Sequence, residues 1–351
     1  MTTAARGRFF EDFVLGETIE HATPRTLTDG DAALYQALYG SRFVLQSSSI
    51  FAQKLGLKSA PLDDLLVFHT VFGKSVPDIS LNAVANLGYA EGKFLGPVFH
   101  GDTLSAQSQI IGLRENSNRK SGIVYVRTRA INQDDDLILD FVRWVMVNKR
   151  SEQSLTPQKV PRLADSFEAS MLAAGMIMPQ FRCEKYDCTL AGSSKRWANY
   201  APGDRIDHGD GQTIEEAEHQ LATRLYQNTA KVHFDALLQG QSRFGKRLVY
   251  GGHVISIARA LSFNGLENAI SIVALNAGTH AAPTFAGDTI YAWSEILECA
   301  ETARRPDIGF LRVRTVATKN EAASAFPYRD DAGAYHPSIV LDLDYWVALP
   351  R

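Results

Sequence analysis

The sequence of 351 residues lacks several features that would assign it to particular protein classes. It holds only three cysteines, Cys183, Cys188 and Cys299, which are too few and too unevenly spaced for a disulfide framework or for paired zinc-binding CxxC motifs. No apolar run approaches the roughly 18 residues that a membrane span needs, and residues 1–8 hold no apolar signal-peptide core. We therefore expect the whole chain to work in the reducing cytoplasm, without a membrane partner.

Charge and motif content exclude further classes. Lys and Arg total 36 against 39 Asp and Glu, and the formal charge of -3 offers no basic excess for the phosphates of nucleic acid. The glycine-rich nucleotide-binding motifs are absent, and the nine histidines form no HxxH or HExxH pattern, so no metal or nucleotide cofactor is expected. What is present, 45% hydrophobic and 21% charged residues, is typical of a globular chain of about two domains.

The chain contains an internal repeat at an offset of 187 residues. Residues 16–46 align without a gap with residues 203–233, and seven of these 31 positions are identical, among them Gly16, His21 and Tyr39. Such self-similarity indicates that one structural unit is used twice.

Further blocks continue the repeat in the same order. Residues 97–104 match residues 283–290 in five of eight positions, and both segments contain Gly-Asp-Thr. Residues 122–130 match residues 309–317 in five of nine positions. The last strand-like segment matches at an offset of 202, so the second copy holds 15 extra residues, which we assign to a long loop at 321–337.

The repeat predicts two copies of one fold, at 8–150 and 195–351, joined by a linker at 151–194. The Ser- and Pro-containing start of this linker favours an extended segment, and a short helix is predicted at 164–174.

Both copies have the same predicted secondary structure. A capping-box spacing, Thr28 with Asp31 and Thr213 with Glu216, predicts the start of a first helix. A second helix is apolar enough to be buried and begins near residue 62 or 249. Four strand-like segments follow in the first copy, at 80–92, 102–113, 121–132 and 137–148. Because strands follow strands, we predict an α+β fold, in which a curled antiparallel sheet wraps a buried central helix in each copy.

This layout, with a polar loop that ends in His and a strand that carries Pro-x-Phe-x-Gly-Asp-Thr, resembles the hotdog fold of the MaoC-type enoyl-CoA hydratases. Both copies resemble it, so the resemblance implies a double hotdog. It also implies an enzyme that reversibly adds water to an acyl-CoA substrate, here a branched enoyl-CoA with a free carboxylate. Coenzyme A would then be part of the substrate, with no separate cofactor. Two hotdogs already pair within the chain, and a homodimer of the chain is compatible with the resemblance.

The signature of that family, Gly-Asp-x-Asn-Pro-Leu-His, supplies a catalytic Asp and His. In the second copy His233 falls on the signature His, while Asn228 stands where the Asp belongs. In the first copy Ser41 and Gln46 occupy the same two positions. The resemblance therefore implies that the second copy is catalytic, with His233 as the base, and that the first copy is degenerate.

Substrate-binding residues are expected at the start of the second apolar helix. The four residues are Tyr250, Gly251, Gly252 and His253. The two glycines permit close approach, and the first free N–H groups of the helix would face a thioester oxygen. The first copy has Asp63 and Asp64 there, which would repel an oxyanion. Nearby, Lys231 and Arg243 are candidates to bind the free carboxylate or the phosphates of coenzyme A.

Several alternatives stay open from the sequence. Asp235, two residues beyond His233, is a candidate for the missing carboxylate. His69, with Gly73 and Pro77, comes within one residue of the His-x3-Gly-x4-Pro motif of polyketide-type dehydratases, and Asp235 fits their Asp-x3-Gln. Three other functions are compatible with this fold: an (R)-specific hydratase of another enoyl-CoA, a hotdog acyl-CoA thioesterase and a non-catalytic acyl-binding protein.

Overall fold

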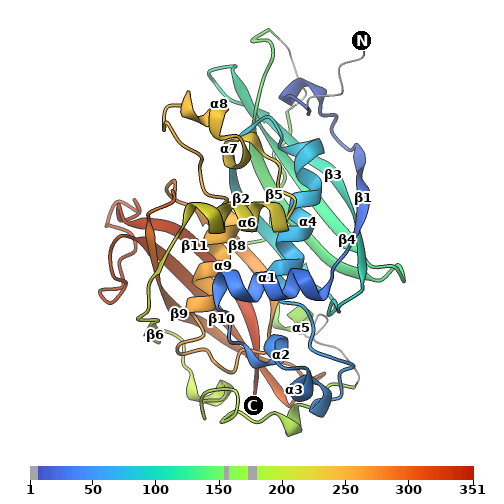
Figure 1. Cartoon of the computed structure of the whole chain (residues 1–351), viewed down its shortest axis with the longest axis vertical. Helices are drawn as coiled ribbons and strands as arrows, with labels where there is room; N and C mark the ends of the chain where they lie inside the picture. The colour runs from blue at the N-terminus through green and yellow to red at the C-terminus, as the bar shows by residue number, and fades with distance from the viewer. Residues whose placement is uncertain (1–6, 154–157, 173–179) are drawn as a thin grey trace.

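One continuous antiparallel sheet of eleven strands forms the body of the molecule, in a computed structural model that describes residues 7–153, 158–172 and 180–351 (Figure 1). The first copy contributes β1 (Thr18–Thr26), β2 (Ala83–Phe94), β3 (Thr103–Glu115), β4 (Ser121–Ile131) and β5 (Leu137–Asn148). The second contributes β6 (Arg205–Asp207), β7 (Gln212–Thr213), β8 (Ser271–His280), β9 (Thr289–Glu301), β10 (Ile308–Lys319) and β11 (Ile339–Pro350).

The helices lie mainly before the long strands of each copy. The first copy holds η1 (Phe10–Asp12), α1 (Asp29–Tyr39), α2 (Val44–Ser47), α3 (Ser49–Lys54) and α4 (Asp64–Ile79). The linker holds α5 (Ala169–Leu172) and η2 (Cys183–Lys185). The second copy holds η3 (Trp197–Asn199), α6 (Glu216–Leu225), α7 (Lys231–Phe234), α8 (Ala236–Gly240) and α9 (Gly251–Leu261). Among the described residues, no helix is long and apolar enough to cross a membrane.

The two copies join edge to edge. The sheet order is β1-β3-β4-β5-β2-β8-β11-β10-β9-β6, with β7 also paired to β9, so β2 and β8 form the seam between the copies. At this seam Tyr89 pairs with Gly278, and Lys93 pairs with Ala274. A double hotdog, as predicted, is confirmed by this topology and by structural relatives described below.

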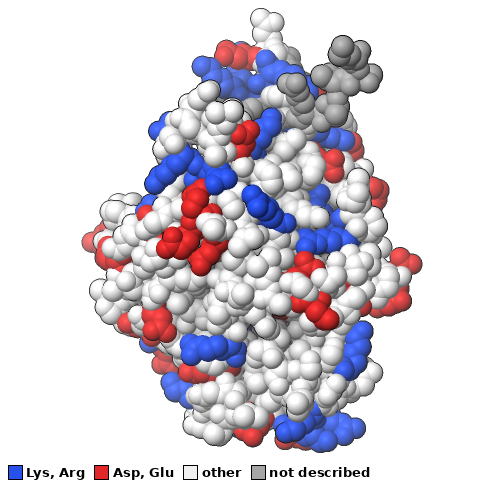
Figure 2. Space-filling model, in the orientation of Figure 1, with Lys and Arg blue, Asp and Glu red and all other residues white. Residues whose placement is uncertain are grey.

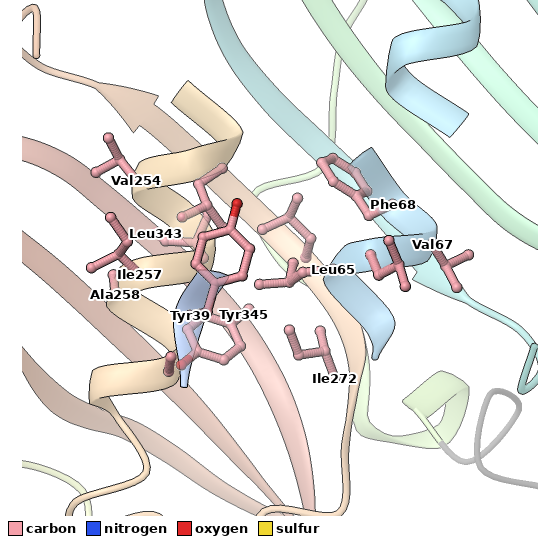
Figure 3. Packing of buried hydrophobic residues seen from close by; sticks show 14 of the residues in the cluster. Tyr39, Leu65, Val67, Phe68, Val254, Ile257, Ala258, Ile272, Leu343 and Tyr345 are labelled. Carbon is pink, nitrogen blue, oxygen red and sulfur yellow. The ribbon is translucent and has the colours of Figure 1, made fainter. Parts of the chain in front are cut away.

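The two central helices, α4 and α9, pack against the shared sheet and contribute to one core. Leu66, Phe72, Ile257 and Leu343 belong to a single cluster of buried residues that spans both copies. Figure 3 shows how Tyr39 lies between the residues of α4 and those of α9. The predicted apolar helices therefore face each other, which brings residues of the two copies together.

The repeated Gly-Asp-Thr segment is a turn that leads into β3 and β9. Gly101 and Gly287 have φ values of 91° and 94°, a conformation that favours glycine. The following Asp102 and Asp288 each accept a backbone N–H three residues back, at 2.7 and 2.9 Å. The motif is thus maintained by the same turn geometry in both copies.

The sequence patterns predicted most helices and strands correctly but placed some of their ends wrongly. Thr28 caps α1, with Asp31 completing the capping box, as expected. The second box was placed wrongly, because Thr213 lies in β7 opposite Thr289, and the N-cap of α6 is Glu215. Of the helix predicted at 164–174, α5 forms only a part, and residues 173 and 174 lie outside the described residues, as do residues 154–157 of the predicted extended segment.

Candidate active site

His233 lies on the short helix α7, at the end of the loop that follows α6. Its Nδ1 is 2.9 Å from the Leu248 carbonyl oxygen. Because a carbonyl can only accept, Nδ1 carries the proton and Nε2 presents a lone pair. Burial lowers the pKa of His233 to about 4, against the opposing effect of the bond to Leu248. The imidazole is therefore neutral at pH 7, the state that a general base requires.

Asn228 is buried and shapes the same loop. Its side-chain Oδ1 accepts the backbone N–H of Ala230 at 3.2 Å, and its backbone N–H donates to the Thr223 carbonyl. The loop rests on the first copy, since a Cβ added to Gly73 of α4 would lie 1.7 Å from the Tyr226 carbonyl oxygen. Asn228 thus holds the turn that delivers the chain to His233.

The start of α9 has no side-chain cap. Tyr250 is its N-cap residue and makes no capping hydrogen bond with its side chain. In the first copy, Asp63 accepts the N–H of Leu65 at 2.9 Å, and Leu65 aligns with Gly252. The first N–H groups of α9 thus lack the carboxylate that covers α4, which leaves them for an oxygen that gains negative charge.

His69 of the first copy faces this helix start. It lies in the middle of α4, fully buried, with Nδ1 3.3 Å from the Tyr250 hydroxyl. A Cβ on Gly252 would lie 2.6 Å from the same Nδ1, so glycine is needed there for the close approach. The His69 Nε2 atom has no partner among the described residues.

Further histidines and tyrosines complete a cluster drawn from both copies, in which His233 and His280 are partly buried and the other members are buried. The Tyr39 hydroxyl is 2.9 Å from both the Tyr226 hydroxyl and Nδ1 of His253. On the seam, the Tyr89 hydroxyl is 3.3 Å from Nε2 of His280, whose ring borders Gly251. We call these residues the histidine–tyrosine cluster: Tyr39, His69, Tyr89, Tyr226, His233, Tyr250, His253 and His280.

Four cluster members were missed by sequence reasoning as site residues. They are Tyr39, Tyr89, Tyr226 and His280. Tyr39 and Tyr226 carried a signal, because they are one of the seven identities of the repeat. Tyr89 and His280 carried none, since they meet only through the pairing of β2 with β8. Although the cluster is rich in histidine, no group of three side chains suited to a metal ion occurs among the described residues.

Three predicted residues lie apart from the cluster. Asp235 is exposed and caps α8, accepting the N–H of Leu238 at 2.9 Å, so the structure does not pair it with His69. Lys231 is exposed, and Arg243 is exposed with its guanidinium 4.5 Å from the Phe244 ring centroid. Figure 2 shows basic side chains on the face where α7 and α8 lie, with acidic side chains beside them.

The first copy forms a small pocket at the position equivalent to this site. Ser41, Gln46 and Asp63 line it, and Gln46 donates from Nε2 to the Ile270 carbonyl. Burial raises the pKa of both Asp63 and Asp64, the latter to about 7. Acidic groups and a glutamine thus replace the uncapped helix start and the imidazole of the second copy.

Comparison with known proteins places the chain in a family. Residues 1–332 match the family of mesaconyl-CoA hydratases. A mesaconyl-CoA hydratase of Cereibacter sphaeroides is 59% identical over 98% of both chains. A β-methylmalyl-CoA dehydratase of Chloroflexus aurantiacus is 58% identical over 98% of this chain and 97% of its own length.

Solved structures agree with these relatives. A MaoC-domain dehydratase from Chloroflexus aurantiacus superposes with a TM-score of 0.96 and 57% identity, covering 100% of this chain and 99% of its own. A Mycobacterium tuberculosis protein described as a double hotdog superposes with a TM-score of 0.75 and 25% identity, covering 98% of this chain and 99% of its own. The chain therefore belongs to the mesaconyl-CoA hydratase family, within the double-hotdog MaoC-like proteins.

Proposed function

We propose that this protein is a hydro-lyase that reversibly adds water to mesaconyl-CoA to give β-methylmalyl-CoA. The observation that carries the proposal is the identity of 58 and 59%, over nearly the whole chain, to relatives named for the two directions of this reaction. The geometry of His233 and the α9 start supports the same chemistry, because a neutral base lies beside a helix start without a cap.

His233 and the backbone of α9 divide the chemical work. As water adds to the β-carbon, Nε2 of His233 takes one of its protons, and the electron pair of the double bond moves toward the thioester oxygen. The N–H groups of Gly251 and Gly252, together with the helix dipole, stabilise the enolate oxygen that forms. The protonated His233 then returns the proton to the α-carbon, so that one water has been added in total.

The two copies have different parts in this proposal. The second copy supplies His233 and the start of α9, while the first copy contributes Tyr39, His69 and Tyr89 as the opposite wall of the cluster. His69 would act as a positioning residue, holding the Tyr250 hydroxyl beside Gly252. The only coenzyme in the scheme is the CoA of the substrate.

An assay with mesaconyl-CoA tests the proposal. Addition of water removes the ultraviolet absorbance of the enoyl thioester and releases no free thiol. A thioesterase would instead release thiol, and an acyl-binding protein would give neither signal while still binding. Either of those outcomes would overturn the proposed reaction, and activity on unbranched enoyl-CoAs alone would overturn the substrate.

Substitution of His233 tests the mechanism. His233→Gln is expected to lower kcat by about 100-fold or more, because general base catalysis is lost. Gln46→Ala is the matched control, since Gln46 aligns with His233 in the first copy and contacts the Ile270 carbonyl instead. Equal losses in both variants would contradict the role of His233.

A further inference from the structure

Arg143 of β5 is a fully buried arginine with incomplete polar contacts. Its Nη2 donates to the Ser75 and Ser80 hydroxyls at 2.9 and 3.4 Å, and its guanidinium lies 4.3 Å from the Phe72 ring centroid. Its Nε and Nη1 atoms have no partner among the described residues. A buried charge without a counter-ion destabilises a fold, so its presence here calls for a functional reason.

The guanidinium lies next to the histidine–tyrosine cluster. The ring of Phe72, on which it rests, is 5.5 Å from the Tyr250 ring and 6.2 Å from the Tyr89 ring between centroids. Burial raises the pKa of Tyr250 well above its ordinary value, and the positive charge of Arg143 acts against that rise. The Phe72 ring therefore contacts both the Arg143 guanidinium and Tyr250, the N-cap residue of α9.

The second copy holds a structural counterpart, Arg259 of α9. Arg259 donates to the Ser262 hydroxyl at 3.1 Å, and Ser262 aligns with Ser75 at the offset of 187. Its guanidinium also rests on an aromatic ring, 3.6 Å from the centroid of Phe43. The two arginines come from different elements, β5 and α9, yet they occupy matching environments.

Each of the two arginines also affects the pKa of one of two aligned histidines, His21 and His208. Burial lowers the pKa of His21 and of His208, which are aligned in the repeat. The charge of Arg143 adds to the lowering for His21, and the charge of Arg259 adds to it for His208. Each arginine therefore acts on one of the two aligned histidines, although the arginines themselves do not align in the repeat, where Phe72 stands at the position of Arg259.

The two arginines differ in the carboxylates near them. Burial raises the pKa of Asp63 and Asp64, and the charge of Arg259 opposes that rise in both. Tyr250 and Gly251 stand at the aligned positions near Arg143, so neither acid has a counterpart there. On the nearby end of α4, Asp78 is bonded to Nδ1 of His21 at 2.8 Å. Asp63 and Asp64 of the first copy therefore act on Arg259 of the second copy, whereas the aligned residues of the second copy, Tyr250 and Gly251, offer no carboxylate to Arg143.

We propose that Arg143, from the first copy, binds the free carboxylate of the substrate in the active site of the second copy and so selects dicarboxylic acyl thioesters. This inference rests on the proposed function. A guanidinium that is buried, with two nitrogens unpartnered among the described residues, gains most from a carboxylate that arrives without water. The thioester end of the same substrate would then reach the start of α9.

The test compares two substrates, mesaconyl-CoA and crotonyl-CoA, which lacks the free carboxylate. Arg143→Met is expected to lower kcat/KM for mesaconyl-CoA by about 100-fold, because a charge-assisted hydrogen bond to the substrate is lost. The kcat/KM for crotonyl-CoA should change by less than about threefold. Arg143→Lys keeps the charge without the planar fork and should lie between Met and wild type. Because Lys preserves the charge and length, it gives a readout even where the Met variant does not fold.

Arg259→Met is the matched control. This variant removes the arginine that lies near two carboxyl groups of the protein itself, Asp63 and Asp64. It should leave the ratio of the two kcat/KM values as in wild type. If wild type is inactive on mesaconyl-CoA, the proposed function fails. If wild type is active and both Arg143 variants keep the wild-type ratio, the role of Arg143 alone is overturned. An equal loss on both substrates would also overturn it, since that indicates a purely structural role.

Discussion

His233 is kept neutral by its surroundings, and this sets the pH range in which it can act. Its pKa is lowered to about 4, chiefly by burial, so the lone pair on Nε2 is available throughout the neutral range. We expect kcat/KM to be flat between pH 6 and 8 and to fall only below about pH 4 to 5, as the imidazole gains a proton. An acid limb with its midpoint near 6.5 would contradict this assignment.

The substrate carboxylate titrates in a similar range and needs a control. Crotonyl-CoA has no such group, so any acid limb measured with it belongs to the enzyme. The same limb with both substrates would assign the titration to His233, and a limb seen with mesaconyl-CoA alone would assign it to the substrate.

Asn228 stands where the signature of the wider family has Asp, beside the loop that carries His233. Asn228→Asp keeps the oxygen that accepts the Ala230 N–H but places a negative charge in a buried position. Repulsion of the substrate carboxylate should lower the kcat/KM ratio of mesaconyl-CoA to crotonyl-CoA by about tenfold or more. Ser41→Asp, at the aligned position of the first copy, is the control, and an unchanged ratio in Asn228→Asp would refute the explanation.

At the scale of elements, the loop that carries His233 packs on α4 at a residue without a side chain, Gly73. Gly73 allows the Tyr226 carbonyl to approach the helix, since a Cβ would lie 1.7 Å from that oxygen. Gly73→Ala should therefore displace the loop that leads to His233. We expect a loss of about 1 to 3 kcal/mol in the free energy of unfolding, measured with urea, together with a marked fall in kcat.

Gly240→Ala provides the comparison for that prediction. Gly240 ends α8, and a Cβ there would meet nothing within 4 Å. Its free energy of unfolding should stay within about 0.5 kcal/mol of wild type. If Gly73→Ala behaves like Gly240→Ala, the contact between α4 and the loop does not position the site.

Local patterns predicted the elements better than the site. The apolar run after residue 62 could only be a buried helix, and α4 follows it closely. Thr213 shows where local patterns fail. Its spacing to Glu216 predicted a helix cap, but the residue pairs with Thr289 across the sheet instead. Residues 250–253, which are contiguous, were predicted as site residues and stay a prediction. The contact of Tyr89 with His280 across the seam was not predicted, because no local pattern encodes it.

At the scale of the whole molecule, the two copies have diverged in complementary ways. The first keeps acidic groups at its helix start and glutamine in place of the imidazole, and these residues line its small pocket. The second keeps an uncapped helix start, and Tyr39, His69 and Tyr89 of the first copy contact its residues there. Fusion in one chain allows the halves to differ in this way, which two identical subunits could not do.

The buried histidines make the stability of the fold sensitive to acid. His69 and His253 are fully buried and His208 nearly so, and burial lowers their pKa values to about 3, 3 and 4. The unfolded chain binds protons near pH 6.5, whereas the folded chain does not until the pH is far lower. Stability is therefore fully present above pH 6.5 and is lost as the pH falls from there toward 4.

Each of these histidines should contribute a slope of up to about 1.4 kcal/mol per pH unit to the free energy of unfolding in that window. Urea unfolding between pH 7.5 and 5 measures it, and His208→Gln should give a shallower slope by one such contribution. A wild-type free energy that stays constant from pH 6.5 to 5 would mean that these imidazoles gain protons within the fold, and that the buried cluster opens to water before the chain unfolds.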